Sequence, residues 1–494
     1  MTIFEAGSGS LITPLISTGA GKGTLPFGLA ITPNGATAYV NAQNGPEVTT
    51  GGSVTAMNLA TETPAAQIEQ VGAAPVGVAI TPDGKHAYVA SRVTATVSMI
   101  DTATNLVIGP PIKVGTEEES ADRGVAITPD GSRVYVARFG DDLVSVIDTA
   151  TNTVLGAPIP VGDGPRELAI TPDGRRIYVT NFNDSATGNS VSVIDTATNT
   201  VVGAPIPVGK NPRGIAITPN GTRAYVANNG DATVSVIDTA TNTVLGSPIP
   251  VGPDPVGVAV TPDGSRALVA SEAPAPNNVI TPISTATNTA GPRFQSGGEA
   301  PAEIAIVPNQ PPKAAFTASH SKKKPTAESF NGSGSSDSDG SVARLDWNFG
   351  DGQSLANGGP TPSHTYTKPG SYTATLTVTD NEGCSTKFVF TGQTAGCNGS
   401  AVAAASQAIG IPPQTKIKKH PPKKTTSRTA KFKFKADEKG ARFKCKLDRK
   451  KFRKCAKSFK ATVEPGPHAL QVKAVGTGGA DPTPAKFKWT VLPG

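Results

Sequence analysis

The 494-residue sequence predicts an all-β protein: a β-propeller, which is a ring of repeated four-stranded sheets, followed by two smaller β-sandwich modules. Three observations support this prediction. Short alternating runs of Val, Ile and Thr are separated by turn residues, a pattern typical of β-strands. A unit of 43 to 49 residues recurs along residues 1–309, which is the length of a propeller blade. The composition then changes near residue 312 and again near residue 401.

Each repeated unit contains four predicted strands. In the unit 211–252, the strands read GIAIT, RAYVAN, ATVSVID and TVLGSPIPVG, and short turns join them, so neighbouring strands must be antiparallel. The first turn, TPNG, combines a Pro with fixed φ and a flexible Gly. In the second turn, Asp238 and Asn242 can bond their own backbone. Seven prolines mark the seven units: Pro33, Pro82, Pro129, Pro172, Pro219, Pro262 and Pro308.

The seventh unit is incomplete. Its first strand, within residues 302–307, ends at Pro308, and no second strand follows it. The first nineteen residues align without a gap on residues 191–209, which are the third and fourth strands of a unit. We therefore expect the N-terminal strands to complete the seventh blade and close the ring, which removes free sheet edges. Because a second strand is missing, we expect the natural chain to start upstream with that strand and a signal peptide. A three-stranded seventh blade is the alternative.

The second strand of each unit points to a family. It reads IYVTN at residues 177–181, and AYVAN, AYVAS and VYVAR in sister units. These residues resemble the YVTN-type β-propeller repeats of prokaryotic surface-layer and secreted proteins, over residues 1 to about 308. The resemblance implies a seven-bladed propeller, residues 1–309, at or outside the cell surface. It implies no particular activity, because propellers host many functions.

Residues 312–400 resemble a PKD domain, which is an immunoglobulin-like β-sandwich. Trp347 and Phe349 alternate toward one face of a predicted strand, and the glycines of the following GDG turn permit a positive φ. The resemblance gives these residues a structural role. The motif residues are Trp347, Phe349, Gly350, Asp351, Gly352, His364 and Tyr366.

The C-terminal part of the chain is strongly basic. From Gln414 onward the sequence has 23 Lys and Arg residues and five Asp and Glu residues, a balance of +18, whereas the rest of the chain has a balance of −11. We expect a linker over residues 401–422 and an immunoglobulin-like sandwich over residues 423–494, which resembles the C-terminal modules of bacterial secreted proteins. In this module Phe432 and Phe434 alternate with Lys431, Lys433 and Lys435, which predicts an apolar interior and a lysine exterior.

The four cysteines lie outside the propeller repeats. Cys384 and Cys397 fall in the PKD-like module, and Cys445 and Cys455 flank a predicted hairpin of the basic module. We expect one disulfide within each module, which small secreted domains often use, and hence an exported protein. Four reduced core thiols are the alternative. The spacing does not fit a zinc site. No run of 18 apolar residues predicts a transmembrane helix.

The sequence offers few candidates for chemistry. A propeller enzyme of the lactonase or glycan-active type would place unlike polar residues around its central channel. Equivalent positions in the blades instead read as near-identical and mostly small or apolar, so we predict no catalytic residues and no cofactor. His86 is the one histidine of the propeller repeats, which does not favour a copper or redox site.

Acidic loops raise the question of calcium. Glu117 to Glu119 lie in a loop between blades, where solvent exposure explains them. Asp141, Asp142, Asp184 and Asp231 fall in the same loop of successive blades, and Asp337 and Asp339 lie in the PKD-like module. Such carboxylates could bind calcium, although turn formation is the favoured interpretation.

We interpret the chain as a monomeric, non-catalytic extracellular or cell-surface protein for binding, adhesion or scaffolding. Its expected partners are proteins or cell-wall and extracellular glycans, and not nucleic acid. For the basic module, a solubilising lysine coat is favoured over binding of anionic wall polymers, lipid head groups or nucleic acid. The alternative function is that of a propeller enzyme of the lactonase or glycan-active type.

Overall fold

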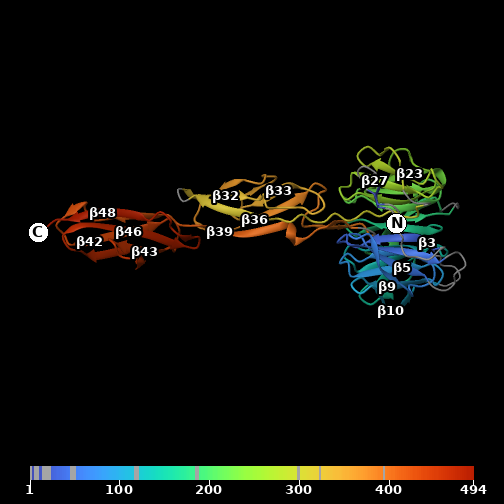
Figure 1. Cartoon of the computed structure of the whole chain (residues 1–494), viewed down its shortest axis with the longest axis horizontal. Helices are drawn as coiled ribbons and strands as arrows, with labels where there is room; N and C mark the ends of the chain where they lie inside the picture. The colour runs from blue at the N-terminus through green and yellow to red at the C-terminus, as the bar shows by residue number, and fades with distance from the viewer. Residues whose placement is uncertain are drawn as a thin grey trace. The chain divides into compact units, whose positions relative to one another are not determined.

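The computed structural model describes residues 3–4, 11–13, 24–44, 52–115, 122–183, 188–296, 301–321, 324–392 and 395–493. The chain divides into two compact units: residues 1–310 with 382–399, and residues 311–381 with 400–494. Figure 1 shows β-sheets throughout. Two 3₁₀ turns, Asn229–Asp231 and Ala401–Ala403, are the helical elements of the described residues. No helix among these residues is long and apolar enough to cross a membrane.

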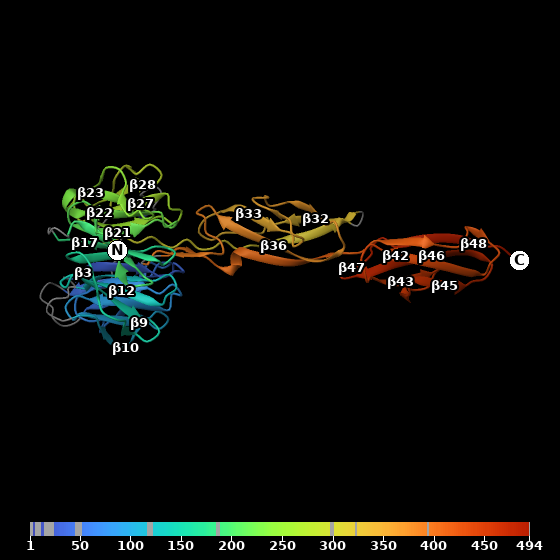
Figure 2. The same cartoon turned by 180° about the vertical axis from the view of Figure 1, so that it is seen from behind.

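Six antiparallel sheets form the propeller repeats, as the sequence predicts (Figures 1 and 2). The first three sheets hold β3 (Thr24–Ile31), β4 (Thr37–Asn44), β5 (Ser53–Asn58) and β6 (Thr63–Ile68); β7 (Pro75–Ile80), β8 (His86–Ser91), β9 (Thr96–Asp101) and β10 (Leu106–Lys113); and β11 (Asp122–Ile127), β12 (Arg133–Arg138), β13 (Leu143–Asp148), β14 (Thr153–Val154) and β15 (Ile159–Pro160).

In the later sheets the fourth strand is split into two short segments that both pair with the third strand. The remaining three sheets hold β16 (Pro165–Ile170), β17 (Arg176–Asn181), β18 (Ser190–Asp195), β19 (Thr200–Val201) and β20 (Ile206–Pro207); β21 (Pro212–Ile217), β22 (Arg223–Asn228), β23 (Thr233–Asp238), β24 (Thr243–Val244) and β25 (Ile249–Pro250); and β26 (Pro255–Val260), β27 (Arg266–Ser271), β28 (Val279–Ser284), β29 (Thr289–Ala290) and β30 (Phe294–Gln295).

The cores lie between neighbouring blades. Each pair of successive sheets, from the first to the sixth, shares one cluster of buried side chains. The seventh position is taken by residues 302–307, which form no strand ladder. Ile304 and Ile306 pack with the sixth sheet, and Ala305 packs with the first. Among the described residues, this segment thus lies between the sixth and the first of six complete sheets.

The N-terminal residues form the predicted hairpin in part. β1 (Ile3–Phe4) pairs with β2 (Leu11–Thr13), and Phe4 faces Leu11. The aligned residues Ile194 and Val201 pair in the same way in the fourth sheet, so the hairpin reproduces the third and fourth strands of a unit. Residues 5–10 and 14–23 lie outside the described residues. Pairing of the N-terminal segment with residues 302–307 therefore stays a prediction.

A tyrosine of the second strand connects each blade to the next. The Tyr135 hydroxyl donates a hydrogen bond of 2.7 Å to Asn199 Oδ1, which lies in the turn after the third strand of the following blade. Asn199 has a left-handed φ of 53°, which Asn tolerates better than most residues. Burial, with the charge of Asp101, raises the pKa of Tyr39 to about 12, so its hydroxyl remains a donor. The five pairs are Tyr39–Asn105, Tyr88–Asn152, Tyr135–Asn199, Tyr178–Asn242 and Tyr225–Asn288.

These bonds correct one expectation. Asp238 does accept the N–H groups of Ala240 and Thr241, as predicted for a turn. The Asn242 side chain, however, accepts the Tyr178 hydroxyl of the preceding blade at 2.6 Å, in place of a bond to its own backbone.

The second unit contains two sandwiches. In the PKD-like sandwich, one sheet holds β31 (Thr317–Ser321), β32 (Lys324–Asn331) and β35 (Ser363–Thr365), and the other holds β34 (Ser354–Leu355), β33 (Val342–Asn348), β36 (Gly370–Asp380) and β39 (Ala404–Ile411). In the C-terminal sandwich, one sheet holds β40 (Thr415–Lys419), β42 (Thr429–Ala436) and β45 (Ser458–Thr462), and the other holds β41 (Lys424–Thr425), β48 (Ala485–Val491), β46 (Gly466–Gly476), β43 (Arg442–Leu447), β44 (Arg453–Cys455) and β47 (Gly479–Ala480).

The predicted linker over residues 401–422 is wrong. β39 pairs with β36 along eight residues and is the last strand of the PKD-like sandwich, and β40 pairs with β42 as the first strand of the C-terminal sandwich. The Ala- and Ser-rich composition suggested a linker, but small residues at 404–411 suit a strand at a sheet edge beside β36. Residues 382–399 also leave the predicted PKD-like range, because they belong to the propeller unit.

We predict that Tyr135→Phe lowers the free energy of unfolding of the propeller by about 1–2 kcal/mol, because Asn199 Oδ1 loses its donor in a part-buried position. Calorimetry of the full chain measures the propeller transition. Tyr372→Phe is the matched control: its hydroxyl donates to Lys368 O at an exposed site, so a change within about 0.5 kcal/mol is expected. Equal effects of the two variants would contradict a specific role for the bond between blades.

Candidate functional site: the central channel

The first strands of the blades line the central channel, and small residues allow them to lie close together. In β3, a Cβ on Gly28 would lie 2.2 Å from the carbonyl oxygen of Val76 on β7, so only Gly fits there. Equivalent positions in four other units are also Gly: 77, 124, 214 and 257. The remaining two units carry Glu167 and Glu303.

The prediction that channel positions are near-identical and small is therefore wrong at two of seven positions. Glu167 and Glu303 line a cavity of about 20 Å³ at the start of the first strands, together with Arg166 and Arg213. The sequence does reveal the two glutamates when the segments PVGVA, PRELA and PAEIA are aligned, because Glu167 and Glu303 then stand where the first segment has Gly77.

Each arginine of this cluster has a further partner in the wall. Arg213 forms an ion pair of 2.5 Å with Glu272, and its side chain is 11% exposed. The Arg166 guanidinium lies over the Phe182 ring, 4.6 Å from its centroid, a favourable cation–π distance. The Arg213 charge is thus largely balanced within the protein wall.

Glu303 has a strongly perturbed carboxyl group. Burial, with the charge of Glu167 added, raises its pKa from 4.5 to about 8, against the opposing influence of the Ile304 N–H, Arg213 and Arg166. The raised pKa favours the protonated form of this carboxyl group. A protonated carboxyl beside a second carboxylate is an arrangement that general acid–base catalysis can use.

A hairpin from a distant part of the sequence closes the other end of the channel. β37 (Phe388–Phe390) pairs with β38 (Ala395–Asn398), and Phe390 and Ala395 are buried against the second and third blades. The tip accepts hydrogen bonds from two first strands: Ile127 N–H donates to Gly392 O at 3.0 Å, and Ile170 N–H donates to Thr391 O at 3.2 Å. Thr391 and Gly396 line a residual cavity of about 50 Å³.

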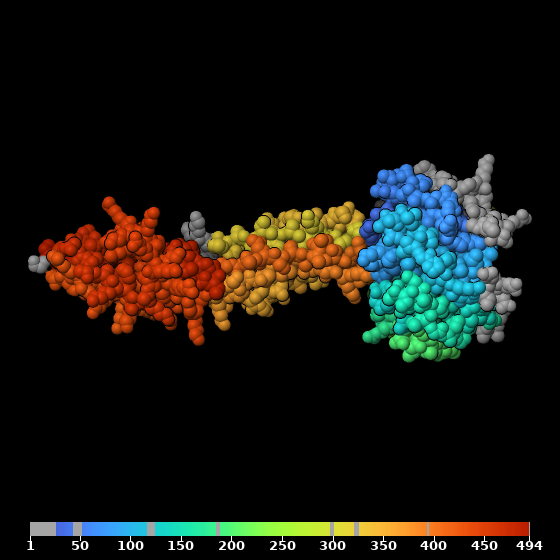
Figure 3. All heavy atoms as spheres, turned by 90° about the horizontal axis from the view of Figure 1, so that it is seen from below, coloured from blue at the N-terminus to red at the C-terminus, as the bar shows by residue number. Residues whose placement is uncertain are grey.

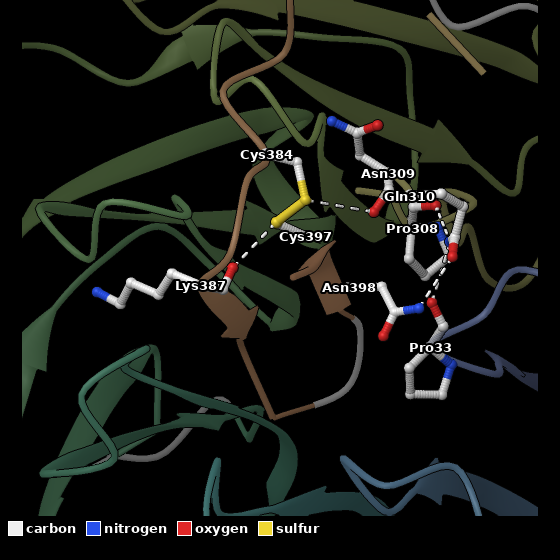
Figure 4. The surroundings of a disulfide bond; sticks show 8 residues. All are labelled: Pro33, Pro308, Asn309, Gln310, Cys384, Lys387, Cys397 and Asn398. Carbon is white, nitrogen blue, oxygen red and sulfur yellow. Dashed lines mark hydrogen bonds between the residues drawn. A yellow bond between two sulfur atoms is a disulfide. The ribbon is translucent and has the colours of Figure 1, made fainter. Parts of the chain in front are cut away.

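The hairpin is also bound to the end of the seventh segment (Figure 4). The Asn398 N–H donates to Asn309 O at 2.9 Å, and Asn398 Nδ2 donates to Gln310 Oε1 at 2.9 Å. Gln310 Nε2 in turn donates to the Pro33 carbonyl of the first blade at 3.1 Å. The hairpin thus contributes to closure of the ring at the seventh position.

Both predicted disulfides are present, Cys384–Cys397 and Cys445–Cys455. The second lies in the C-terminal sandwich, as expected. The first was expected to stabilise the PKD-like sandwich, but it crosslinks the base of the channel hairpin, where Cys384 Sγ lies 3.7 Å from Asn309 O. The prediction placed this disulfide in the PKD-like sandwich because both cysteines fall within residues 312–400. Residues 382–399 instead belong to the propeller unit.

The PKD motif residues form a structural cluster in their own sandwich. Trp347, Phe349 and Tyr366 are buried, and the Tyr366 hydroxyl donates to Phe349 O at 2.9 Å. The His364 ring stacks on Phe349 and lies 2.8 Å from Asp351. Burial alone would raise the pKa of Asp351, but the His364 bond and the Gln353 N–H lower it. Gly350 and Gly352 have φ values of 79° and 92°, as the predicted turn requires.

The acidic loops divide into two groups. Asp142 accepts the Gly164 N–H and Asp231 accepts the Lys210 N–H, each at 2.7 Å, so both carboxylates bond to the segment that leads to the next blade and not to their own turn. Asp337 has a raised pKa because burial and the charges of Asp339 and Asp380 act together. Among the described residues no group of three acidic, His or Cys side chains has the geometry to hold a metal ion. Glu117 to Glu119 and Asp184 lie outside those residues.

We predict that Glu303→Gln raises the melting temperature of the propeller at pH 8.5 and leaves it nearly unchanged at pH 4.5. The pKa of Glu303 is about 8 in the folded protein and 4.5 in the unfolded chain, so the unfolded chain loses this proton first as the pH rises. The free energy of unfolding of the wild type therefore falls between pH 4.5 and pH 8. The amide side chain introduced by Glu303→Gln has no charge at either pH, so the variant does not lose this stability as the pH rises. An equal shift at both pH values would contradict the raised pKa.

We also predict that Cys384→Ser with Cys397→Ser lowers the stability of the propeller by about 2–3 kcal/mol, because the disulfide closes a short loop at the base of the hairpin. Calorimetry resolves which unit is affected. Cys445→Ser with Cys455→Ser is the control and should leave the propeller transition unchanged. A propeller that melts identically in both double variants would show that the hairpin does not stabilise the ring.

Two family models match the chain. Residues 9–200 match the model described as lactonase, 7-bladed beta-propeller, and residues 309–393 match the model of the PKD domain. Among curated proteins, the pre-pro-metalloprotease PrtV of Vibrio cholerae is 55% identical over 49 residues, which are 10% of this chain and 5% of that protein. Collagenase ColA of Clostridium perfringens is 39% identical over 75 residues, 15% and 7% of the two chains.

A microbial collagenase of Vibrio alginolyticus is 36% identical over 78 residues, which are 16% of this chain and 9% of that protein. The chain thus spans less than a tenth of each of these relatives. Among solved structures, hydrazine synthase of Kuenenia stuttgartiensis is similar with a TM-score of 0.49 and 25% identity, over 57% of this chain and 89% of that one. A functionally unknown protein from Desulfotomaculum acetoxidans is similar with a TM-score of 0.46 and 20% identity, over 57% of this chain and 88% of that one. The chain is an all-β protein that combines a propeller of the lactonase-model type, a PKD domain and a second β-sandwich.

Proposed function

We propose that this chain is an extracellular, non-catalytic protein for binding or scaffolding, and that its domains present surfaces to protein or glycan partners at the cell surface. The observation that carries this proposal is the closed central channel. Pockets that hold a small-molecule substrate usually measure about 300–1,000 Å³. The two channel cavities measure about 50 and 20 Å³, which suits a few water molecules.

The setting outside the cell is supported by the two disulfides. Disulfides form and persist mainly in oxidising compartments, and both cysteine pairs of this chain are bonded. The resemblance of the propeller repeats to the YVTN-type repeats of surface-layer and secreted proteins agrees with this setting.

A propeller enzyme of the lactonase or glycan-active type is the second candidate. The Glu167–Glu303 pair with its neighbouring arginines favours it, as does the lactonase-model match over residues 9–200. For this function the channel would have to open at the charged end, where Phe27 and Val256 now narrow the cavity.

Activity assays on the full chain separate the two candidates. We predict that lactones and soluble glycans are hydrolysed no faster by the wild type than by a Glu167→Gln, Glu303→Gln double variant, whereas both proteins are retained on cell-wall material or by protein partners. A wild-type rate at least 10-fold above that of the double variant would establish the enzyme and overturn the non-catalytic proposal.

A further inference from the structure

The outer face of one sheet of the C-terminal sandwich carries a regular row of lysines. β42 is the central strand between β40 and β45, and its residues Lys431, Lys433 and Lys435 are exposed. Phe432 and Phe434 point the other way and are 1% and 6% exposed. The strand therefore places one ammonium group on every second residue of a single outer face.

Each of these lysines lies directly opposite another lysine. The register pairs Lys435 with Lys416, Lys433 with Lys419, and Lys431 with Lys460. Like charges at directly opposed positions destabilise a sheet. In the part of this module that the structure describes, none of the six forms an ion pair with a carboxylate; the pairs there are Arg428–Glu464 and His468–Asp448.

The face is also hollowed. A groove of about 870 Å³ runs along it, lined by Lys419, Lys431, Lys433 and Lys460, with His420 and Phe459 among its other walls. The His420 ring is held by stacking on Phe487, with centroids 3.9 Å apart, so this wall is fixed to the core. Figure 3 shows this module as red spheres with long side chains that project from its surface.

We propose that this groove, the lysine groove, binds an extended anionic carbohydrate polymer. Lysines two apart on a strand are about 6.6–6.8 Å apart, and neighbouring strands about 4.8 Å apart, so the charges form a grid rather than a single pocket. A linear polymer with one anion on each or every second sugar can pair with several of them at once. Bound anions would relieve the repulsion that the opposed lysines impose on the sheet.

Two other polyanions fit less well. Binding of single-stranded nucleic acid usually relies on several exposed aromatic side chains that stack with successive bases. Of the aromatic residues along this groove, Phe432 is 1% exposed, Phe459 is half-buried, and the His420 ring is already stacked on Phe487. Binding to a membrane surface usually involves apolar side chains that enter the lipid, and the outward positions of the three strands are Lys, Ser and Thr. The proposal goes beyond the proposed function, because it assigns a ligand class and a site to the C-terminal module.

The experiment measures binding of the full chain to immobilised polygalacturonate and heparin, with neutral dextran as reference. We expect binding to both anionic glycans and none to dextran, with a steep loss as salt rises. Lys431→Gln, Lys433→Gln and Lys460→Gln in one variant should weaken binding by about 10-fold or more, since three of the pairing charges are removed.

The matched control removes three charges from the opposite sheet: Lys444→Gln, Lys486→Gln and Lys488→Gln, all at exposed positions. We expect a change of less than about 3-fold. Thermal melting checks folding, and the groove variant should melt at the same or a higher temperature because the opposed charges are gone.

Equal losses in the two triple variants, or no binding to either glycan, would overturn the proposal. Tighter binding to oligothymidylate, or to vesicles with 30% phosphatidylserine, than to both glycans would also overturn it, in favour of a different polyanion. None of these outcomes bears on the hydrolysis assay, so failure of the lysine groove and failure of the non-catalytic proposal can be told apart.

Discussion

A propeller is stable only if every blade buries both of its faces against neighbours, and the ring must therefore close. In this chain the contact between blades is repeated as one hydrogen bond, from a second-strand tyrosine to an asparagine in the next blade. The tyrosine is buried on an apolar face, and the asparagine holds the left-handed turn residue. One bond thus couples blade packing to turn geometry, which explains why the two motifs recur together.

The two junctions beside the seventh position lack both partners of this bond. The sixth blade has Leu268 where the tyrosine would be, and the aligned residue of the N-terminal segment is Gly9. The first blade has Glu62 at the asparagine position, and no second strand of a seventh blade lies among the described residues to reach it. Donor and acceptor have changed together, as a physical pairing requires.

Closure at these junctions uses other contacts. Residues 302–307 pack between the sixth and first blades, and Gln310 bonds to the Pro33 carbonyl. The disulfide-linked hairpin adds hydrogen bonds to Asn309 and to β11 and β16, the first strands of the third and fourth blades. The same hairpin occupies one end of the channel, so it contributes both to ring closure and to the small size of the two channel cavities, about 50 and 20 Å³.

The repeat length, the strand order and both disulfide pairings could be predicted from sequence, because each depends on local periodicity or spacing. The channel hairpin could not, since residues 388–390 read equally well as a strand of the PKD-like sandwich. The hairpin is placed in the propeller by hydrogen bonds from Ile127 and Ile170, which lie more than 200 residues earlier in the sequence. Glu167 and Glu303 could have been found by aligning the first strands position by position. The two carboxyl groups come close together because the neighbouring glycines let the first strands approach one another, and this closeness is a property of the closed ring.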